Sequence, residues 1–286
     1  MTELMQRILP TVQKPARYTG GEWGEIKKDL KDVRVRVAFC FPDTYEIGMS
    51  NLGMRILYGV MNGMDGVWCE RVFAPWGDME QAMRDNSLPL WALESQTPVR
   101  EFDMIAFTIG YEMAYSNILN MLNLAGVPLR SKDRQGLKNI VFAGGVCAFN
   151  PEPLADFIDF FSLGEGEDIT VEILQLYDRA KAEGWSKDAF LHEAAKIPGV
   201  YVPSFYRHEY NADGTLAAIV PLEGVPQTVT KRIIEDLDNA YFPTKMIVPS
   251  TEIVHDRANL EVFRGCIRGC RFCQAGFSLS LIHISE

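Results

Sequence analysis

Short apolar segments of two kinds alternate along most of this chain, and the alternation restricts its fold more than any other feature. Strand-like segments, with apolar residues at every second position or in one continuous run, cover residues 33–41, 68–73, 103–109, 139–143 and 157–163. Helix-like segments cover residues 51–61, 78–85, 116–125 and 168–183. Alternating strands and helices form a parallel sheet with helices on both faces. The sequence therefore predicts one doubly wound α/β domain at residues 31–185.

The residues outside this domain have other patterns. Residues 1–30 are polar and irregular, which suggests an N-terminal arm. Prolines interrupt residues 186–250, and the turn-forming stretch Asn211-Ala212-Asp213-Gly214 predicts a small hairpin followed by a linker. In residues 251–278, a strand candidate from Asn259 to Phe263 leads into a loop rich in cysteine.

Composition and charge exclude several classes of protein. The 286 residues are 47% hydrophobic and 23% charged, which is ordinary for a globular protein. No apolar run approaches the roughly 20 residues of a membrane span, and the N-terminus lacks the pattern of a secretory signal, so we expect a cytoplasmic protein without a membrane partner. The net charge of −10 argues against a broad nucleic-acid surface. Cys40, Cys69 and Cys147 stand among apolar neighbours and are expected in the core.

The other three cysteines, Cys266, Cys270 and Cys273, form a C-x-x-x-C-x-x-C array. Thiolates are soft ligands, and cysteines this close together favour a metal ion or an iron–sulfur cluster. Three thiolates can hold three irons of a four-iron cluster and leave the fourth iron open to a small molecule. Gly265 and Gly269 permit the tight backbone path that such a loop requires.

Two other interpretations of the array are a zinc site and a disulfide. A structural zinc site normally has four ligands, and no fourth Cys or His follows at ordinary zinc spacing. A disulfide between such close neighbours suits secreted proteins. The cluster is therefore the favoured interpretation, with zinc as the alternative.

The array, with an aromatic residue just before its third cysteine, closely resembles the signature of the radical SAM (S-adenosylmethionine) superfamily. This resemblance implies that Cys266, Cys270 and Cys273 bind a 4Fe-4S cluster, and that Phe272 packs beside the cluster and the adenine. The open iron would bind S-adenosylmethionine, whose cleavage gives a 5′-deoxyadenosyl radical. An electron donor such as flavodoxin or ferredoxin would be a partner.

The doubly wound domain resembles the Rossmann-like cobalamin-binding domains that precede some radical SAM barrels. Asp43, Tyr45 and Gly48 resemble their D-x-H-x-x-G loop, with Tyr45 in place of the ligand histidine. Gly144 and Gly145 resemble the paired glycines beside the cobalamin nucleotide tail. Whether cobalamin binds is left open, because the histidine is absent.

Two further motifs belong to this resemblance, which covers about residues 31–278. Lys14-Pro15-Ala16-Arg17-Tyr18 and Gly20-Gly21-Glu22 resemble the opening of one such family. Gly164-Glu165-Gly166-Glu167 resembles a turn common in these domains; it is too acidic for a phosphate site, and capping of the following helix is its alternative role.

The end of the chain departs from the family, which continues with further strand–helix units. Residues 279–286 look like the translation of a transposon end used in sequencing libraries, so we expect residues 251–278 to be the truncated start of a radical SAM (β/α) barrel. A natural short C-terminal strand is the alternative. This fragment alone is expected to be inactive.

For the parent protein, the resemblance implies methylation or another radical modification of an unreactive carbon, assisted by cobalamin if it binds. A radical SAM methylthiotransferase-like enzyme without cobalamin and a non-enzymatic binding module with a zinc knuckle are the alternatives. The sequence does not identify the substrate, because substrate contacts would lie in the barrel.

Overall fold

A six-stranded sheet forms the centre of the structure, a computed structural model that describes residues 3–257 and 259–274. The strand order is β2-β1-β3-β4-β5-β6; the first five strands are parallel and β6 is antiparallel to β5. The strands are β1 Val35–Phe41, β2 Val67–Phe73, β3 Met104–Thr108, β4 Ile140–Gly144, β5 Phe160–Ser162 and β6 Val200–Tyr201. The predicted α/β class and the five predicted strands of this sheet are confirmed.

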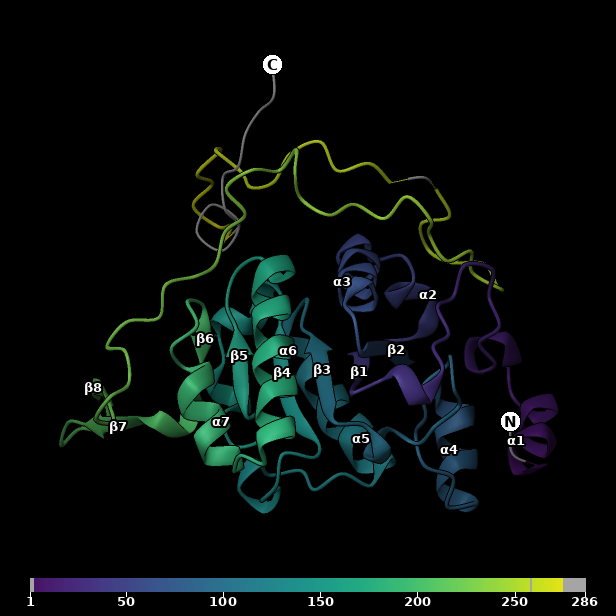
Figure 1. Cartoon of the computed structure of the whole chain (residues 1–286), viewed down its shortest axis with the longest axis horizontal. Helices are drawn as coiled ribbons and strands as arrows, with labels where there is room; N and C mark the ends of the chain where they lie inside the picture. Colours follow the sequence, from purple (N-terminus) through teal and green to yellow (C-terminus); the bar gives the residue numbers. More distant parts are fainter. Residues whose placement is uncertain (1–2, 258, 275–286) are drawn as a thin grey trace.

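Helices cover both faces of the sheet, as predicted (Figure 1). One face packs against α3 Leu52–Gly63, α6 Gly166–Glu183 and α7 Lys187–Ala194. The other face packs against α1 Glu3–Ile8, α4 Gly77–Asp85 and α5 Tyr115–Ala125. A single helical turn, α2 Tyr45–Gly48, follows β1. Short 3-10 helices lie at Leu9–Thr11, Pro15–Tyr18, Leu30–Asp32, Val99–Glu101, Glu112–Ala114, Ser131–Asp133, Val146–Phe149, Glu152–Leu154 and Pro203–Phe205.

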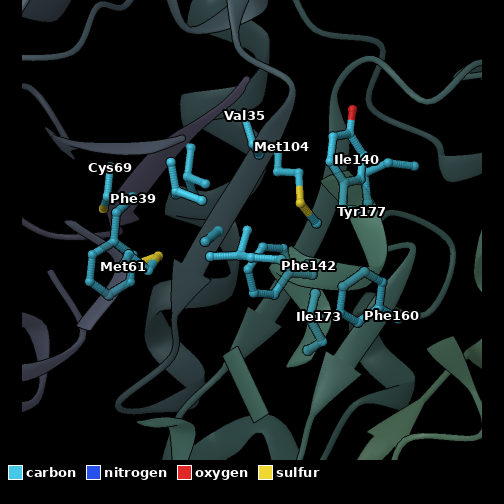
Figure 2. Close-up of a cluster of buried hydrophobic side chains, with 14 of the residues drawn as sticks. Val35, Phe39, Met61, Cys69, Met104, Ile140, Phe142, Phe160, Ile173 and Tyr177 are labelled. Atoms are coloured by element: carbon cyan, nitrogen blue, oxygen red, sulfur yellow. The ribbon is translucent and has the colours of Figure 1, made fainter. Parts of the chain in front are cut away.

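The alternation of side chains in β1 divides the core between the two faces. Val35, Val37 and Phe39 join the cluster under α3 and α6, part of which Figure 2 shows. Ala38 and Cys40 join the cluster on the other face. Of the three cysteines expected in the core, Cys40 of β1 and Cys69 of β2 are buried, and burial raises the pKa of their thiols. Cys147 is only partly buried. Because both faces are covered, most residues of the strands are apolar on both sides.

The sheet continues past residue 185, where the sequence placed the end of the domain. Helix α7 packs beside α6, and β6 pairs with β5 through Phe161 and Ser162. The predicted hairpin is confirmed as β7 Tyr206–Tyr210 paired with β8 Leu216–Pro221, and Gly214 in its turn has a φ of +83°. A left-handed backbone of this kind favours glycine.

Residues 222–257 and 259–263, which we call the linker, run from the hairpin across the edge of the sheet where the parallel strands end, toward α2 and back to the start of α6 (Figure 1). The predicted strand from Asn259 to Phe263 is wrong. Leu260, Val262 and Phe263 are exposed, and no strand pairing among the described residues includes them. An apolar alternation forms a strand only where a neighbouring strand accepts its hydrogen bonds.

In residues 3–257 and 259–274, no helix is both long and apolar enough to cross a lipid bilayer. The expectation for residues 279–286 concerns a segment that lies outside the described residues.

Candidate cysteine-loop site

Residues 14–26, the part of the predicted N-terminal arm that is meant by this name below, lie against the loop that follows β1. Lys14 Nζ lies 3.1 Å from Glu46 Oε1, and Arg17 donates to the same carboxylate through Nε and Nη2 at 2.9 and 2.7 Å. Burial alone raises the pKa of Glu46, but the hydrogen bonds from Arg17 and Lys14 outweigh it, so this pKa lies below its ordinary value. The arm and the loop are thus joined by partly buried charges.

A second set of charges lies deeper, around Arg71 of β2. Its guanidinium, 2% exposed, donates to both oxygens of Glu22 at 2.9 Å and to Glu94 Oε1 at 2.6 Å. Burial raises the pKa of Glu94 above its ordinary value. Burial also opposes ionisation of Glu22, but the charge and hydrogen bonds of Arg71 outweigh burial, so the pKa of Glu22 lies below its ordinary value. A buried ion must be paired in this way, because an unpaired one is costly.

The side chains of the predicted cobalamin loop, Asp43, Tyr45 and Gly48, make contacts within the protein. Tyr45 is 1% exposed, and its hydroxyl donates to Glu22 Oε1 at 2.8 Å and accepts from the Ser250 N–H at 3.3 Å. A side chain at Gly48 would place its Cβ 2.3 Å from the Phe73 ring. The Asp43 carboxylate accepts from the Tyr111 hydroxyl. Tyr45 and Gly48 therefore face the protein interior, which does not fit contact with cobalamin, and no step below depends on that cofactor.

The paired glycines Gly144 and Gly145 lie where β4 ends and allow close backbone contacts. A Cβ at Gly145, whose φ is +102°, would lie 2.7 Å from the Ile109 carbonyl oxygen. The Ile109 N–H donates to the Gly144 carbonyl at 2.7 Å, and the Cys147 N–H donates to the Ile109 carbonyl at 3.1 Å. These glycines bring the ends of β3 and β4 together, and Gly145 also lines the cavity described below.

The linker contacts the same region as the N-terminal arm. The Val248 N–H donates to the Trp23 carbonyl at 2.9 Å, and the His255 N–H donates to Ser50 Oγ at 3.0 Å. Together with the contact between Ser250 and Tyr45, these bonds hold the linker along the strand ends. The path of the chain toward Cys266 is therefore defined by the arm and by the loop after β1.

The linker is also held by residues 164–168, which we call the acidic turn, at the start of α6. Gly164 forms a bridge with Arg232, and the Glu165 N–H donates to the Arg232 carbonyl at 2.9 Å. The Glu165 carboxylate accepts from the Ile234 N–H. Gly164 has a φ of +101°, and a Cβ there would lie 2.0 Å from the Arg232 carbonyl oxygen. Glycine is therefore required at this contact.

Arg264 joins the acidic turn to residues 264–274, which we call the cysteine loop. Its Nη2 lies 2.5 Å from Glu167 Oε1 and 2.8 Å from Glu261 Oε2, and its Nε lies 2.7 Å from Glu261 Oε1. Glu165 Oε2 is 3.7 Å from Nη1. Burial makes ionisation of Arg264 less favourable, but these carboxylates raise its pKa above the ordinary value. The acidic turn thus binds the segment just before the first cysteine.

A cavity of about 460 Å³ lies between the cysteine loop and the strand ends. Its walls come from the start of α3, the turn after β4, the acidic turn and the segment around Arg264. Apolar side chains and glycines make up most of the lining; among them are Leu52, Ile56, Leu57, Gly145, Phe149 and Phe263. Ligands of doubly wound sheets bind at this edge.

The three predicted ligands lie in one exposed loop. Cys266 is partly exposed, and Cys270 and Cys273 are exposed, with the Cys273 N–H donating to the Cys270 carbonyl at 3.1 Å. Phe272 is 93% exposed. No group of three His, Cys, Asp or Glu side chains in the described residues is arranged to hold a metal ion. The three thiols suit an iron–sulfur cluster by their chemistry alone.

Arg264, Arg71 and Glu22 were not predicted from the sequence as interacting residues. Arg71 had one signal: it stands, with its neighbour Glu70, in an otherwise apolar strand, and an arginine in such a strand requires a buried acidic partner. Glu22 was noted only as part of a motif. For Arg264, the acidic turn was noticed but its partner was not, since the two are 97 residues apart.

Comparison with known proteins places the doubly wound domain in a family. Residues 53–203, more than half of the chain, match the family described as radical SAM proteins, N-terminal. The chain therefore belongs to this family, which confirms the radical SAM expectation. It is also 24% identical over 245 residues to an uncharacterized protein of Methanocaldococcus jannaschii. That match covers 84% of this chain but 40% of the relative, so the chain spans about two fifths of the relative's length.

Proposed function

We propose that this chain supplies the N-terminal domain and the cluster-binding loop of a radical SAM enzyme, with Cys266, Cys270 and Cys273 as ligands of a 4Fe-4S cluster. The observation that carries the proposal is the C-x-x-x-C-x-x-C array in a chain of this family. When bound, such a cluster supplies the electron that cleaves S-adenosylmethionine and so provides radical chemistry. Exposed thiols in a reducing compartment such as the cytoplasm suit this role.

The chain's own residues have two tasks in this proposal. The cysteine loop supplies thiolates and leaves room for Phe272 to cover one side of the bound group. The domain behind it holds the loop at the edge of the sheet and forms one wall of the cavity. The difficult chemistry belongs to the cofactor, and the protein provides binding and orientation.

The reaction class and the partners are part of the same proposal. Methylation or another modification of an unreactive carbon is the proposed reaction, with flavodoxin or ferredoxin as the type of electron donor. Cobalamin is not part of this proposal, because the contacts of Tyr45 and Gly48 do not fit its binding at the predicted loop. A corrinoid absorption spectrum in the purified protein would show that cobalamin binds and would contradict this conclusion.

Metal analysis tests the cluster directly. The purified chain is reconstituted without oxygen with iron and sulfide, and both are measured per chain, alongside Cys266→Ala, Cys270→Ala and Cys273→Ala. Each replacement should remove most of the bound iron, whereas Cys147→Ala, a partly buried cysteine outside the array, should retain it. A colourless wild-type protein with one zinc and no iron would contradict the proposal and support the zinc alternative.

A further inference from the structure

The acidic turn and the cysteine loop are joined by the ion pairs of Arg264, a residue to which the proposal above gives no role. From it we infer that Arg264 is a positioning residue: by binding Glu167 and Glu165, it holds the cysteine loop, and Cys266 in particular, against the start of α6. The part of this inference that concerns a cluster rests on the proposed function. The part that concerns the position of the cysteine loop is independent of the proposed function.

The geometry is specific to arginine. Nε and Nη2 bind the two oxygens of Glu261 at 2.7 and 2.8 Å, and Nη2 also approaches Glu167. This paired arrangement needs the planar fork of a guanidinium, which lysine lacks. Glu261 belongs to the linker, so Arg264 connects three segments: the linker, the cysteine loop and the acidic turn.

Burial makes these contacts stronger than ordinary surface ion pairs. The side chain of Arg264 is 13% exposed, as is that of Glu165, and that of Glu167 is 9% exposed. Surface pairs contribute little because water screens them, but a partly buried pair is screened much less. Three carboxylates around one arginine also make the arginine necessary, since without it the like charges repel each other.

The acidic turn holds the chain at two places 30 residues apart. The contacts of Gly164 and Glu165 with residues 232–234 fix the chain where it first reaches the turn, and Arg264 fixes it where it returns. The intervening linker is held by the N-terminal arm and by the loop after β1. The start of the cysteine loop is therefore held in place by contacts with the acidic turn and by the contacts that fix the linker before it.

The position of Arg264 limits the position of Cys266. Only Gly265 separates them, and two residues span at most about 7 Å. Gly265 and Arg264 also line the cavity at the strand ends. The first ligand of the proposed cluster is thus held beside this cavity through Arg264.

Hydrogen exchange in the metal-free chain tests the holding of the loop. The variants are Arg264→Gln, Arg264→Lys and Glu167→Gln. Arg268→Gln is the matched control, because Arg268 is an exposed arginine of the same loop and forms no ion pair with another residue that the structure describes. We expect exchange of amides 259–274 to rise about tenfold in Arg264→Gln and Glu167→Gln, less in Arg264→Lys, and not in Arg268→Gln. The double variant Arg264→Gln/Glu167→Gln should be no faster than either single variant.

Exchange in β1 serves as the internal measure of folding, since that strand is far from the replaced residues in the sequence and lies in the core. Unchanged exchange at residues 259–274 in Arg264→Gln, or an equal rise in Arg268→Gln, would overturn the inference.

A second measurement connects the loop to the cluster. In the reconstituted protein, we expect Arg264→Gln to alter the electron paramagnetic resonance signal of the reduced cluster, and Arg264→Lys to restore it in part. If the wild-type chain binds no iron, the proposed function fails while the exchange measurement still decides the role of Arg264. If iron binds and the signal of Arg264→Gln is that of the wild type, Arg264 does not position the cluster.

Discussion

The Tyr45 hydroxyl donates a hydrogen bond of 2.8 Å to Oε1 of Glu22, a residue of the N-terminal arm 23 positions earlier in the chain. Tyr45 stands where the resembled loop has a histidine, and Glu22 ends the Gly-Gly-Glu motif. Because Glu22 also binds Arg71, the tyrosine belongs to a buried ionic cluster that attaches the arm to the sheet. The departure from histidine thus has a structural explanation in this chain.

Replacement of Tyr45 by phenylalanine should destabilise the protein by about 1–2 kcal/mol, because the buried Glu22 carboxylate and the Ser250 N–H each lose a hydrogen-bond partner. Denaturant unfolding measures the change. Tyr210→Phe is the matched control, since Tyr210 is an exposed strand residue, and its replacement should leave stability unchanged. Equal stability of Tyr45→Phe and the wild type would show that the bond is unimportant.

Replacement of Arg71 by methionine should cost about 3–5 kcal/mol, because it leaves the carboxylates of Glu22 and Glu94 buried without their cation. Thermal unfolding followed by circular dichroism would detect it. Arg207→Met, which breaks an exposed pair with Glu209, should have little effect. Adding Glu22→Gln to Arg71→Met should recover part of the loss, and a further loss in the double variant would argue against this explanation.

The pair between Arg17 and Glu46 predicts a dependence of stability on pH. The pKa of Glu46 is lower in the folded state than its ordinary value of 4.5, so its stabilisation is present above pH 4.5 and disappears as the pH falls through the folded pKa. Glu46→Gln should therefore cost about 1–2 kcal/mol at pH 7 and progressively less as the pH falls below 4.5.

Urea unfolding across this range, for the wild type and Glu46→Gln, tests the prediction. Glu223→Gln, at an exposed linker position, is the control and should show no such dependence. A loss that does not become smaller as the pH falls below 4.5 would contradict the assignment to the charge of Glu46.

Replacement of Gly164 by alanine should separate the linker from the acidic turn, because the new Cβ would lie 2.0 Å from the Arg232 carbonyl oxygen. Gly184→Ala is a matched control: Gly184 also has a positive φ, +70°, but nothing lies within 4 Å of its Cβ position. Gly184→Ala should cost about 1–2 kcal/mol from backbone strain, and Gly164→Ala about 1–3 kcal/mol more. Limited proteolysis of residues 222–263 should accelerate only in Gly164→Ala.

Local patterns predicted the five parallel strands and the helices α3, α4, α5 and α6, but not α1, α7 or β6. The alternation of Val33 to Phe41, the turn residues Asn211 to Gly214 and the apolar spacing of residues 51–61 predicted β1, the hairpin and α3. These predictions succeeded because side-chain periodicity and turn chemistry act between near neighbours in the chain. The strand predicted from Asn259 to Phe263 failed because its formation requires a partner strand that local sequence cannot supply.

The sequence by itself determined the α/β class, the five parallel strands with the helices α3 to α6, and the three cysteines that define the proposed cluster loop. Only the tertiary structure decided which charged groups meet: Arg71 with Glu22, 49 residues apart, and Arg264 with Glu167, 97 residues apart. It also decided that Tyr45 faces the interior. The physical reason is that the parallel strands end at one edge of the sheet, and loops distant in the sequence are brought together there by the packing of the whole domain.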